Sequence, residues 1–182
     1  MTGGRLIITA IVLVLLATGC GKNESDNAFS RQEQNIDAIV KSLTSGDTEA
    51  TVDYLSGSVR VTVAHGEGEA LREGGTVSLK YAGYIISGSS LGAGNLFVTN
   101  DKDFAESSNW TVTDSTLFKT DTFVLDGDNF VKGLRTGLAG VKAGDECYVM
   151  FSGKHGFGKH AVGAVPKNSA LAYHLWIGSV SN

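Results

Sequence analysis

Hydrophobic residues follow three different patterns along this chain, and each pattern predicts a different structure. Residues 6–17 form an apolar run, the apolar residues within 36–43 recur at helical spacing, and apolar and polar residues alternate after residue 57. The first run is shorter than the roughly 20 residues that a membrane-spanning helix needs. Because Arg5 precedes it and small residues follow it, residues 1–19 are predicted to be a cleaved secretory signal peptide.

The second pattern predicts a helix that follows a polar tether. Residues 20–30 are polar and charged without an apolar period, which is the composition of a solvated linker. Ser30 and Glu33 match the capping box of a helix start. The apolar positions after them share one helical face: Ile36, Ile39, Val40 and Leu43. We therefore expect a tether over residues 20–30 and a helical leader over residues 31–56, whose main helix spans residues 31–43.

The third pattern predicts a sheet with one helix. Strand patterns occur at residues 59–63, 77–81, 122–125, 146–151 and 170–178. The helical pattern among them starts near Val131 and ends before Gly140. About five strands around one short helix form an antiparallel α+β domain, expected over residues 57–182. Residues 96–119 have no clean period, and we expect them to form a long surface loop.

Cys20 stands where a lipid would be attached. Residues 16–20, Leu-Ala-Thr-Gly-Cys, resemble the bacterial lipobox, in which the signal is cut before a cysteine that bears a diacylglycerol. The lipobox usually has leucine three residues before the cysteine, whereas here Leu16 lies one position further out. Each buried lipid CH₂ contributes roughly 0.8 kcal/mol, so several acyl chains would anchor the protein firmly. A plain secretory signal followed by an incidental cysteine is the alternative.

Composition narrows the function classes. The 182 residues leave room for one domain of ordinary size after the signal peptide. The formal net charge is -4, which argues against a nucleic-acid partner. The second of the two cysteines, Cys147, lies in an apolar strand pattern, so lipidation of Cys20 would leave no internal disulfide.

Three local motif matches are better explained as turns and loops than as catalytic or metal sites. Residues 88–92 match the G-x-S-x-G nucleophile motif, but the helix that must follow the serine is missing from the pattern. Residues 126–129 resemble the start of a calcium loop without its later glycine and glutamate. His155 and His160 have no cysteine or carboxylate at ligand spacing. We therefore expect no metal and no other cofactor.

Two glycines inside the predicted C-terminal helix indicate close packing. Gly133 and Gly137 each cost the helix roughly 1 kcal/mol relative to alanine. Contact between the helix and a sheet at short range would offset that cost. The helix should therefore lie directly on the strands.

An ordered set of short segments surrounds and includes this helix. In chain order the segments are Val77–Tyr84, Leu96–Phe97, Phe123–Leu125, Val131–Leu134, Gly137–Asp145, Gly156–Gly158 and Val165–Tyr173. Together they resemble the FKBP-type peptidyl-prolyl cis/trans isomerases, over about residues 57–180. A lipid anchor and a short helical leader ahead of the domain are similar to the layout of bacterial lipoprotein members of that family.

The resemblance implies a fold, an activity and a set of site residues. The fold is an antiparallel sheet of about five strands wrapped around one short helix, with an aromatic pocket between them. The activity is peptidyl-prolyl isomerisation, which requires no cofactor because a dry pocket weakens the resonance of the amide. The resemblance makes Tyr81, Phe97 and Phe157 catalytic, and it assigns substrate binding to Val98, Val131, Leu134, Val165 and Tyr173.

Four positions depart from the family's pattern. Val98 replaces a pocket aspartate, Leu134 a floor tryptophan, Phe157 a loop tyrosine and Asp121 an aromatic residue. The missing hydroxyl at Phe157 would remove a hydrogen bond worth roughly 1 kcal/mol. Phe123 would supply part of the missing aromatic wall if it faces the pocket. We therefore expect weaker catalysis than that of an enzyme with the full motif.

The sequence leaves three functions open. The first is a prolyl isomerase that is tethered to the cell envelope and acts on X–Pro segments of exported unfolded or folding proteins. The second is a weak or inactive chaperone or binding module of the same fold. The third is a surface lipoprotein that binds another partner through residues 96–119. In each case a lipid on Cys20 would hold the protein at a membrane, either the outer membrane facing the periplasm or, alternatively, the cell surface.

Overall fold

The structure, a computed structural model, describes residues 20–46, 49–110, 115–127 and 130–182. The signal peptide predicted over residues 1–19 lies outside the described residues, as does part of the turn predicted at residues 126–129. Within the described ranges, no helix is both long enough and apolar enough to cross a membrane.

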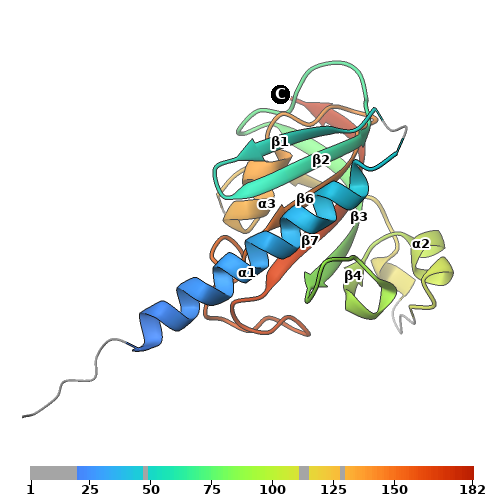
Figure 1. The fold of residues 1–182 in the computed structure, drawn as a ribbon. Coiled ribbons are helices and arrows are strands. Elements are labelled where there is room, and N and C mark those ends of the chain that lie inside the picture. Colours follow the sequence, from blue (N-terminus) through green and yellow to red (C-terminus); the bar gives the residue numbers. More distant parts are fainter. Residues whose placement is uncertain (1–19, 47–48, 111–114, 128–129) are drawn as a thin grey trace, which may run out of the picture.

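In the part of the chain that the structure describes, seven antiparallel strands form one strongly curled sheet (Figure 1). The strands are β1 (Thr51–Leu55), β2 (Ser58–Ala64), β3 (Thr76–Ile86), β4 (Leu96–Thr99), β5 (Asp121–Val124), β6 (Glu146–Phe151) and β7 (Ala170–Ser181). Their order is β1-β2-β6-β7-β3-β4, and β5 pairs with the half of β3 that β4 does not reach. The predicted antiparallel α+β fold is confirmed, with seven strands where the sequence predicted about five.

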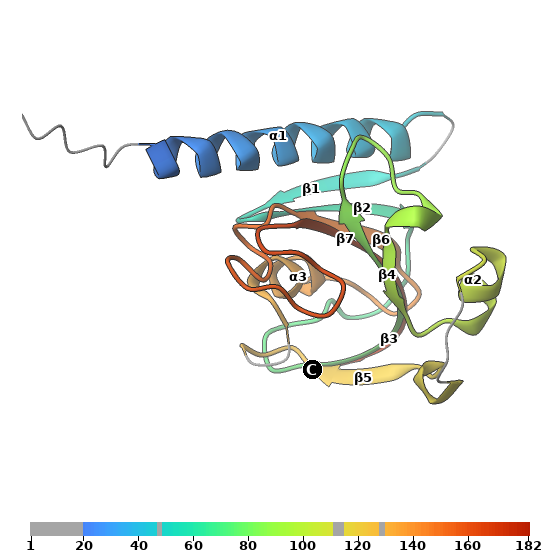
Figure 2. The ribbon, with the colours of Figure 1, turned by 90° about the horizontal axis from the view of Figure 1, so that it is seen from below.

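Helices lie on opposite faces of this sheet. Figure 2 shows α3 (Lys132–Leu138) inside the curl and α1 (Cys20–Leu43) across the outer face. A third helix, α2 (Lys102–Ser107), and two 3-10 turns, η1 (Ala93–Asn95) and η2 (Ser115–Leu117), lie in the connections around β4 and β5. The sheet therefore has an inner face around α3 and an outer face under α1.

The N-terminal part differs from the prediction in three respects. Helix α1 begins at Cys20 and not at residue 31, so the segment predicted as a tether is helical. The Ser30 hydroxyl donates to the Asp26 carbonyl oxygen one turn earlier, 3.0 Å away, so Ser30 is not the helix N-cap. Residues 51–55, predicted as part of the helical leader, form β1. A helix that is anchored at one end extends easily through polar residues, because propagation costs much less than nucleation.

Glycines let α3 pack directly against β6. A Cβ atom at Gly133 would collide with the Phe151 ring, and one at Gly137 would collide with the Val149 side chain. This contact confirms the close packing that the helix glycines predicted. Gly140, two residues after the end of α3, has a φ of +91°, a conformation that glycine adopts without the steric cost of a Cβ atom.

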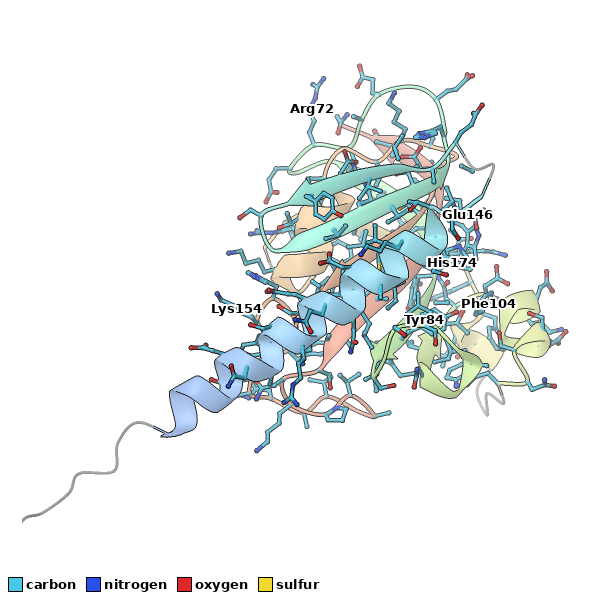
Figure 3. All side chains as sticks on the ribbon, in the orientation of Figure 1. Arg72, Tyr84, Phe104, Glu146, Lys154 and His174 are labelled. Atoms are coloured by element: carbon cyan, nitrogen blue, oxygen red, sulfur yellow. The ribbon has the colours of Figure 1, made fainter. Side chains whose placement is uncertain are left out.

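The outer face is filled by a second hydrophobic cluster. Ile36, Ile39 and Val40 of α1 pack against apolar side chains of β2, β3, β6 and β7. Beyond the end of α1 the cover is aromatic, and Figure 3 shows His174 close to Glu146 with Phe104 nearby toward α2. The Phe104 ring contacts the Trp176 ring at a centroid distance of 5.4 Å.

Residues 96–119, predicted as a long surface loop, contain regular structure in their described part. They include β4, α2 and η2. Asp101 caps α2 by accepting a hydrogen bond from the Phe104 backbone N–H, and Trp110 packs against the outer cluster. The segment therefore folds back onto the domain, because its aromatic residues bury apolar surface there.

Candidate active site

An apolar cavity of about 260 Å³ lies between the inner face of the sheet and α3. It is lined by aliphatic and aromatic side chains: Leu79, Tyr81, Val98, Phe123, Phe130, Leu134, Leu138, Tyr173 and Leu175. Pockets that are mainly apolar, with a few polar groups, are the usual form of a small-ligand site. The cavity is therefore the candidate binding site on the inner face.

The two repeat periods of strand and helix bring these side chains together. Leu79 and Tyr81 are two residues apart on β3, and Tyr173 and Leu175 are two apart on β7, so each pair faces the same side of the sheet. Leu134 and Leu138 are four residues apart on α3 and therefore share one helical face. Strands β4 and β5 close the side of the cavity with Val98 and Phe123.

Aromatic rings form much of the wall and hold one another in place. Phe123 meets Phe130 edge to face, with ring centroids 5.2 Å apart. Tyr173 is contacted by Phe97 at 6.0 Å, nearly perpendicular, and by Phe151 at 6.1 Å in a stacked arrangement. Edge-to-face and offset pairs are the favoured geometries for such rings. The Tyr173 ring therefore has a fixed orientation in the cavity wall.

Both tyrosines of the cavity are kept neutral. Burial raises the pKa of Tyr81, and the Asp121 carboxylate raises it further through its charge and a 3.4 Å hydrogen bond from the phenol. Burial also raises the pKa of Tyr173, with a smaller contribution from Tyr81. At neutral pH both phenols therefore keep their protons and act as hydrogen-bond donors in an otherwise apolar wall.

Asn100 joins the strands that form this wall. Its side-chain oxygen accepts a hydrogen bond from the Tyr81 backbone N–H at 2.7 Å. Its side-chain nitrogen donates to the carbonyl oxygens of Leu79 at 3.2 Å and Lys119 at 2.9 Å. Asn100 is buried, so these bonds satisfy polar groups that water does not reach. It fixes Tyr81 at the point where β3 changes partner from β5 to β4.

Hydrogen bonds from two other elements fix the position of α3. The Gly133 backbone N–H at its start donates to the His155 carbonyl oxygen at 2.8 Å. At its end the Arg60 guanidinium donates to the carbonyl oxygens of Gly137 at 3.1 Å and Ala139 at 2.8 Å, where the helix dipole favours a cation. The floor of the cavity is thereby tied to β2 and to the loop after β6.

The structure brings some of the predicted site residues to the cavity and leaves others outside its lining. Tyr81, Val98, Leu134 and Tyr173 line it, and Phe97 contacts it through the Tyr173 ring. The remaining three lie around it: Val131 is the N-cap of α3, Val165 is buried in the inner core, and Phe157 packs against that core. The catalytic and binding roles of all eight residues stay predictions.

Sequence reasoning missed several residues of the site. Phe130 and Leu138 line the cavity but were not predicted, and Asn100 was not singled out at all. A weak signal existed for Leu138, which follows Leu134 at helical spacing. Phe123, whose facing the sequence left open, does line the cavity. Among the described residues no cluster of three or more His, Cys, Asp or Glu side chains could hold a metal ion.

Three solved structures share the fold at low sequence identity. FkpA from Escherichia coli has a TM-score of 0.57 and 19% identity, and the match covers 88% of this chain and 64% of FkpA, just under two thirds. A peptidyl-prolyl cis-trans isomerase from Pseudomonas syringae has a TM-score of 0.55 and 14% identity, and the match covers 84% of this chain and 95% of that one. The structure of the three FKBP domains of wheat FKBP73 has a TM-score of 0.57 and 19% identity, and the match covers 72% of this chain and 50% of that one.

Sequence comparison identifies the family. A search among curated proteins gave no match. The family described as FKBP-type peptidyl-prolyl cis-trans isomerase matches residues 67–177, which is more than half of the chain. The resemblance inferred from the ordered segments is thus confirmed, and the chain belongs to the FKBP-type peptidyl-prolyl cis-trans isomerase family.

Proposed function

We propose that this chain catalyses cis–trans isomerisation of X–Pro bonds in unfolded or folding proteins. The observation that carries the proposal is the apolar cavity of about 260 Å³, present on the inner face of a chain of this family. A proline ring is apolar and compact, so it would be desolvated by the side chains of this cavity. The neighbouring amide would then lie beside the Tyr81 and Tyr173 phenols.

The cavity suits this chemistry because little more than desolvation is needed. Rotation about a peptide bond faces a barrier of about 18–20 kcal/mol, which comes from resonance in the planar amide. Transfer of the amide from water to an apolar wall disfavours its charge-separated planar form. The neutral phenol of Tyr173, or that of Tyr81 after it releases Asp121, would donate a hydrogen bond to the twisted amide, which binds better than the planar one.

We propose further that catalysis is weaker than in a member with the full motif. Val98 lines the cavity where the family has a carboxylate, and Leu134 forms a softer floor than tryptophan. Phe157 packs against the core but carries no hydroxyl. These substitutions leave an apolar binding surface and remove polar groups that would stabilise a twisted amide.

Protease-free exchange NMR on an Ala-Pro peptide tests the proposal. Wild-type protein should accelerate the exchange, and Val98→Phe, which places a ring in the cavity, should lower kcat/KM at least tenfold, or about 1.4 kcal/mol. The matched control is Tyr54→Phe, because Tyr54 is 70% exposed and lies on β1. Circular dichroism confirms that each variant is folded. An exchange rate equal to the uncatalysed one would contradict the proposal.

A binding module of the same fold is the second candidate, favoured by the missing polar groups at Val98 and Phe157. It would hold proline-containing segments in the cavity without accelerating their isomerisation. Suppressed aggregation of an unfolded client, lost in Val98→Phe, together with unaccelerated exchange would support it. The third function predicted from the sequence is not proposed, because the described part of residues 96–119 packs on the domain.

We also propose that a lipid on Cys20 holds the protein at the cell envelope. The lipobox-like sequence supports this, and α1 begins at Cys20, so the anchor would pass directly into a helix. A helix rises about 1.5 Å per residue, so α1 would act as a stiff spacer and not as a flexible tether. Mass spectrometry should detect acyl chains on the purified protein, and Cys20→Ser should move it from the membrane fraction to the soluble fraction. Unmodified Cys20 would contradict the anchor.

A further inference from the structure

A second cavity, of about 310 Å³, lies between α1, the β1–β2 hairpin and the end of β6. Its apolar lining includes Ile36 and Val59, and its polar lining includes Glu33, Asp37, Tyr54 and Ser58. None of these residues belongs to the inner cavity, which is on the other face of the sheet. The family fold and the proposed isomerase activity leave this second cavity without a role.

The wall that α1 forms is held in place by hydrogen bonds. The Gln32 side-chain oxygen accepts a hydrogen bond from the Gly153 backbone N–H at 2.9 Å. Its side-chain nitrogen donates to the Asn168 carbonyl oxygen at 2.7 Å. Glu33 follows directly in the sequence, so the part of the α1 backbone that carries the exposed Glu33 and Asp37 side chains is held over the cavity. The cavity is therefore preformed.

Two carboxylates on α1 line this cavity, and no lysine or arginine lines it with them. Glu33 and Asp37 are four residues apart, the spacing at which like charges repel on a helix. Among the described residues, neither carboxylate takes part in an ion pair, and the lining contains no lysine or arginine. Burial lowers the pKa of His155, Lys132 and Lys154 lower it further and Glu33 acts in the opposite direction, so the net shift leaves the ring uncharged at neutral pH.

We propose that the second cavity binds the guanidinium group of an arginine side chain in an extended segment of a partner polypeptide. An arginine stem packs well on apolar walls such as Ile36 and Val59 while its charged head meets polar groups. Five N–H donors in one plane can serve both carboxylates, whereas lysine offers a point charge. The exposed Tyr54 ring provides a face on which a guanidinium stacks.

The sheet also offers a place for the rest of such a segment. Strand β1 is at the end of the strand order and, in the described part of the chain, pairs with β2 alone. Its outer edge therefore has free backbone groups, to which an extended chain can add. The inference does not rest on isomerase activity, because no residue of the inner cavity is involved.

Fluorescence anisotropy with labelled, proline-free peptides tests the proposal on the purified protein. The probe contains glycine, alanine and leucine with one central arginine; in matched probes the arginine is replaced by lysine or by uncharged citrulline. The arginine probe should bind at least tenfold more tightly than the citrulline probe, with lysine in between. The double variant Glu33→Gln/Asp37→Asn should lose at least tenfold affinity for the arginine probe.

The matched control is Glu67→Gln, which removes one exposed carboxylate at the opposite end of β2. Its affinity for the arginine probe should equal that of wild type, which separates a defined site from general attraction to an acidic protein. Glu33 and Asp37 are both exposed in the wild type, so the double variant should keep its fold. Equal binding of arginine and citrulline probes, no binding of the arginine probe, or full affinity in the double variant would each overturn the proposal.

Discussion

The inner and outer faces of the sheet present aromatic residues to very different surroundings. On β7, Tyr173 points into a cavity of about 260 Å³. The next residue, His174, lies on the outer face between the rings of Tyr148 and Trp176, at centroid distances of 4.0 and 3.9 Å. Figure 3 shows that Glu146 also approaches it, and its carboxylate is 2.7 Å from the His174 Nε2 atom. The inner ring borders an unfilled space, whereas the outer ring is enclosed.

The lengths of the helices explain this difference. On the outer face α1 has 24 residues and covers several strands, and Phe104 of α2 together with Trp110 covers part of what remains. On the inner face α3 has 7 residues and sits close to β6 because of its glycines. A short helix that lies close to one strand leaves space against the others. The comparison teaches that the apolar space for an X–Pro segment arises where a short helix leaves part of the sheet uncovered, whereas the cavity beside α1 is lined partly by charged and polar groups.

The largest expected effect is on stability at the filled face. Ile86 is 5% exposed on the outer side of β3, and Ile86→Ala should lower the free energy of unfolding by about 2–5 kcal/mol. Leu134→Ala should cost less stability, since Leu134 already borders a cavity, but should raise KM for X–Pro peptides. Urea unfolding and isomerase kinetics on both variants measure this contrast. Equal stability losses with unchanged KM would remove the distinction between the faces.

A second prediction concerns the close contact between α3 and β6 beside the inner cavity. Gly137→Ala should destabilise the protein by about 1–3 kcal/mol, because the new methyl group collides with Val149, although alanine favours a helix by roughly 1 kcal/mol. Gly88→Ala is the control, since a Cβ atom there meets nothing within 4 Å. Thermal and urea unfolding distinguish the two variants. A stabilised Gly137→Ala protein would show that α3 has room to move away from β6.

The enclosed His174 predicts a pH dependence of stability. Burial lowers the pKa of His174 below the ordinary 6.5, while Glu146 acts in the opposite direction. The unfolded chain then binds the proton more readily, so stability is fully present above pH 6.5 and is lost as the pH falls toward the folded-state pKa. The loss should not exceed about 1.4 kcal/mol per pH unit for this one group.

To check this prediction, the free energy of unfolding in urea is measured for wild type and for His174→Gln from about pH 5 to pH 7.5. The variant retains His155, whose pKa burial also lowers, so the difference between the two curves isolates His174. Wild type should lose more stability than the variant on acidification. Parallel curves would mean that the outer-face imidazole accepts a proton as easily as it does in the unfolded chain.

The smallest expected effect is a gain of activity on the inner side. Phe157→Tyr returns a hydroxyl to the loop that packs on the inner core. One added hydrogen bond of about 1 kcal/mol would raise kcat/KM roughly fivefold. Tyr54→Phe again serves as the control for exposed aromatic changes. An unchanged kcat/KM would indicate that residue 157 does not approach the bound X–Pro segment.

Much of the fold could be predicted from local periodicity. The alternation of Val77, Leu79 and Tyr81 places three side chains on the inner face of β3, and all three belong to the inner cluster. The helix glycines predicted contact with the sheet, and the structure has that contact at Val149 and Phe151. Periodicity succeeds here because it reports which side chains share a face, and one face of each element is buried.

The remainder depends on contacts between distant segments. The Asn100 side chain forms hydrogen bonds with β3 residues about twenty positions earlier in the chain. No local sequence pattern identifies a polar residue after a strand as a link to such a distant segment. Phe97 contacts Tyr173 but is outside the cavity lining, and the register between β3 and β4 shifts at this point, which no local pattern predicts. The start of α1 was also missed, since its polar first turns resemble a linker in composition.

The most direct test of the central claim is to map where an X–Pro peptide binds. Backbone ¹H–¹⁵N spectra of the protein are recorded during titration with an Ala-Pro peptide and with an Ala-Ala control peptide. The account predicts shifts at inner-face residues such as Leu79, Tyr81 and Tyr173 with the Ala-Pro peptide alone, and unshifted signals at Tyr84 and His174. Shifts confined to the outer face, or equal shifts with both peptides, would contradict it.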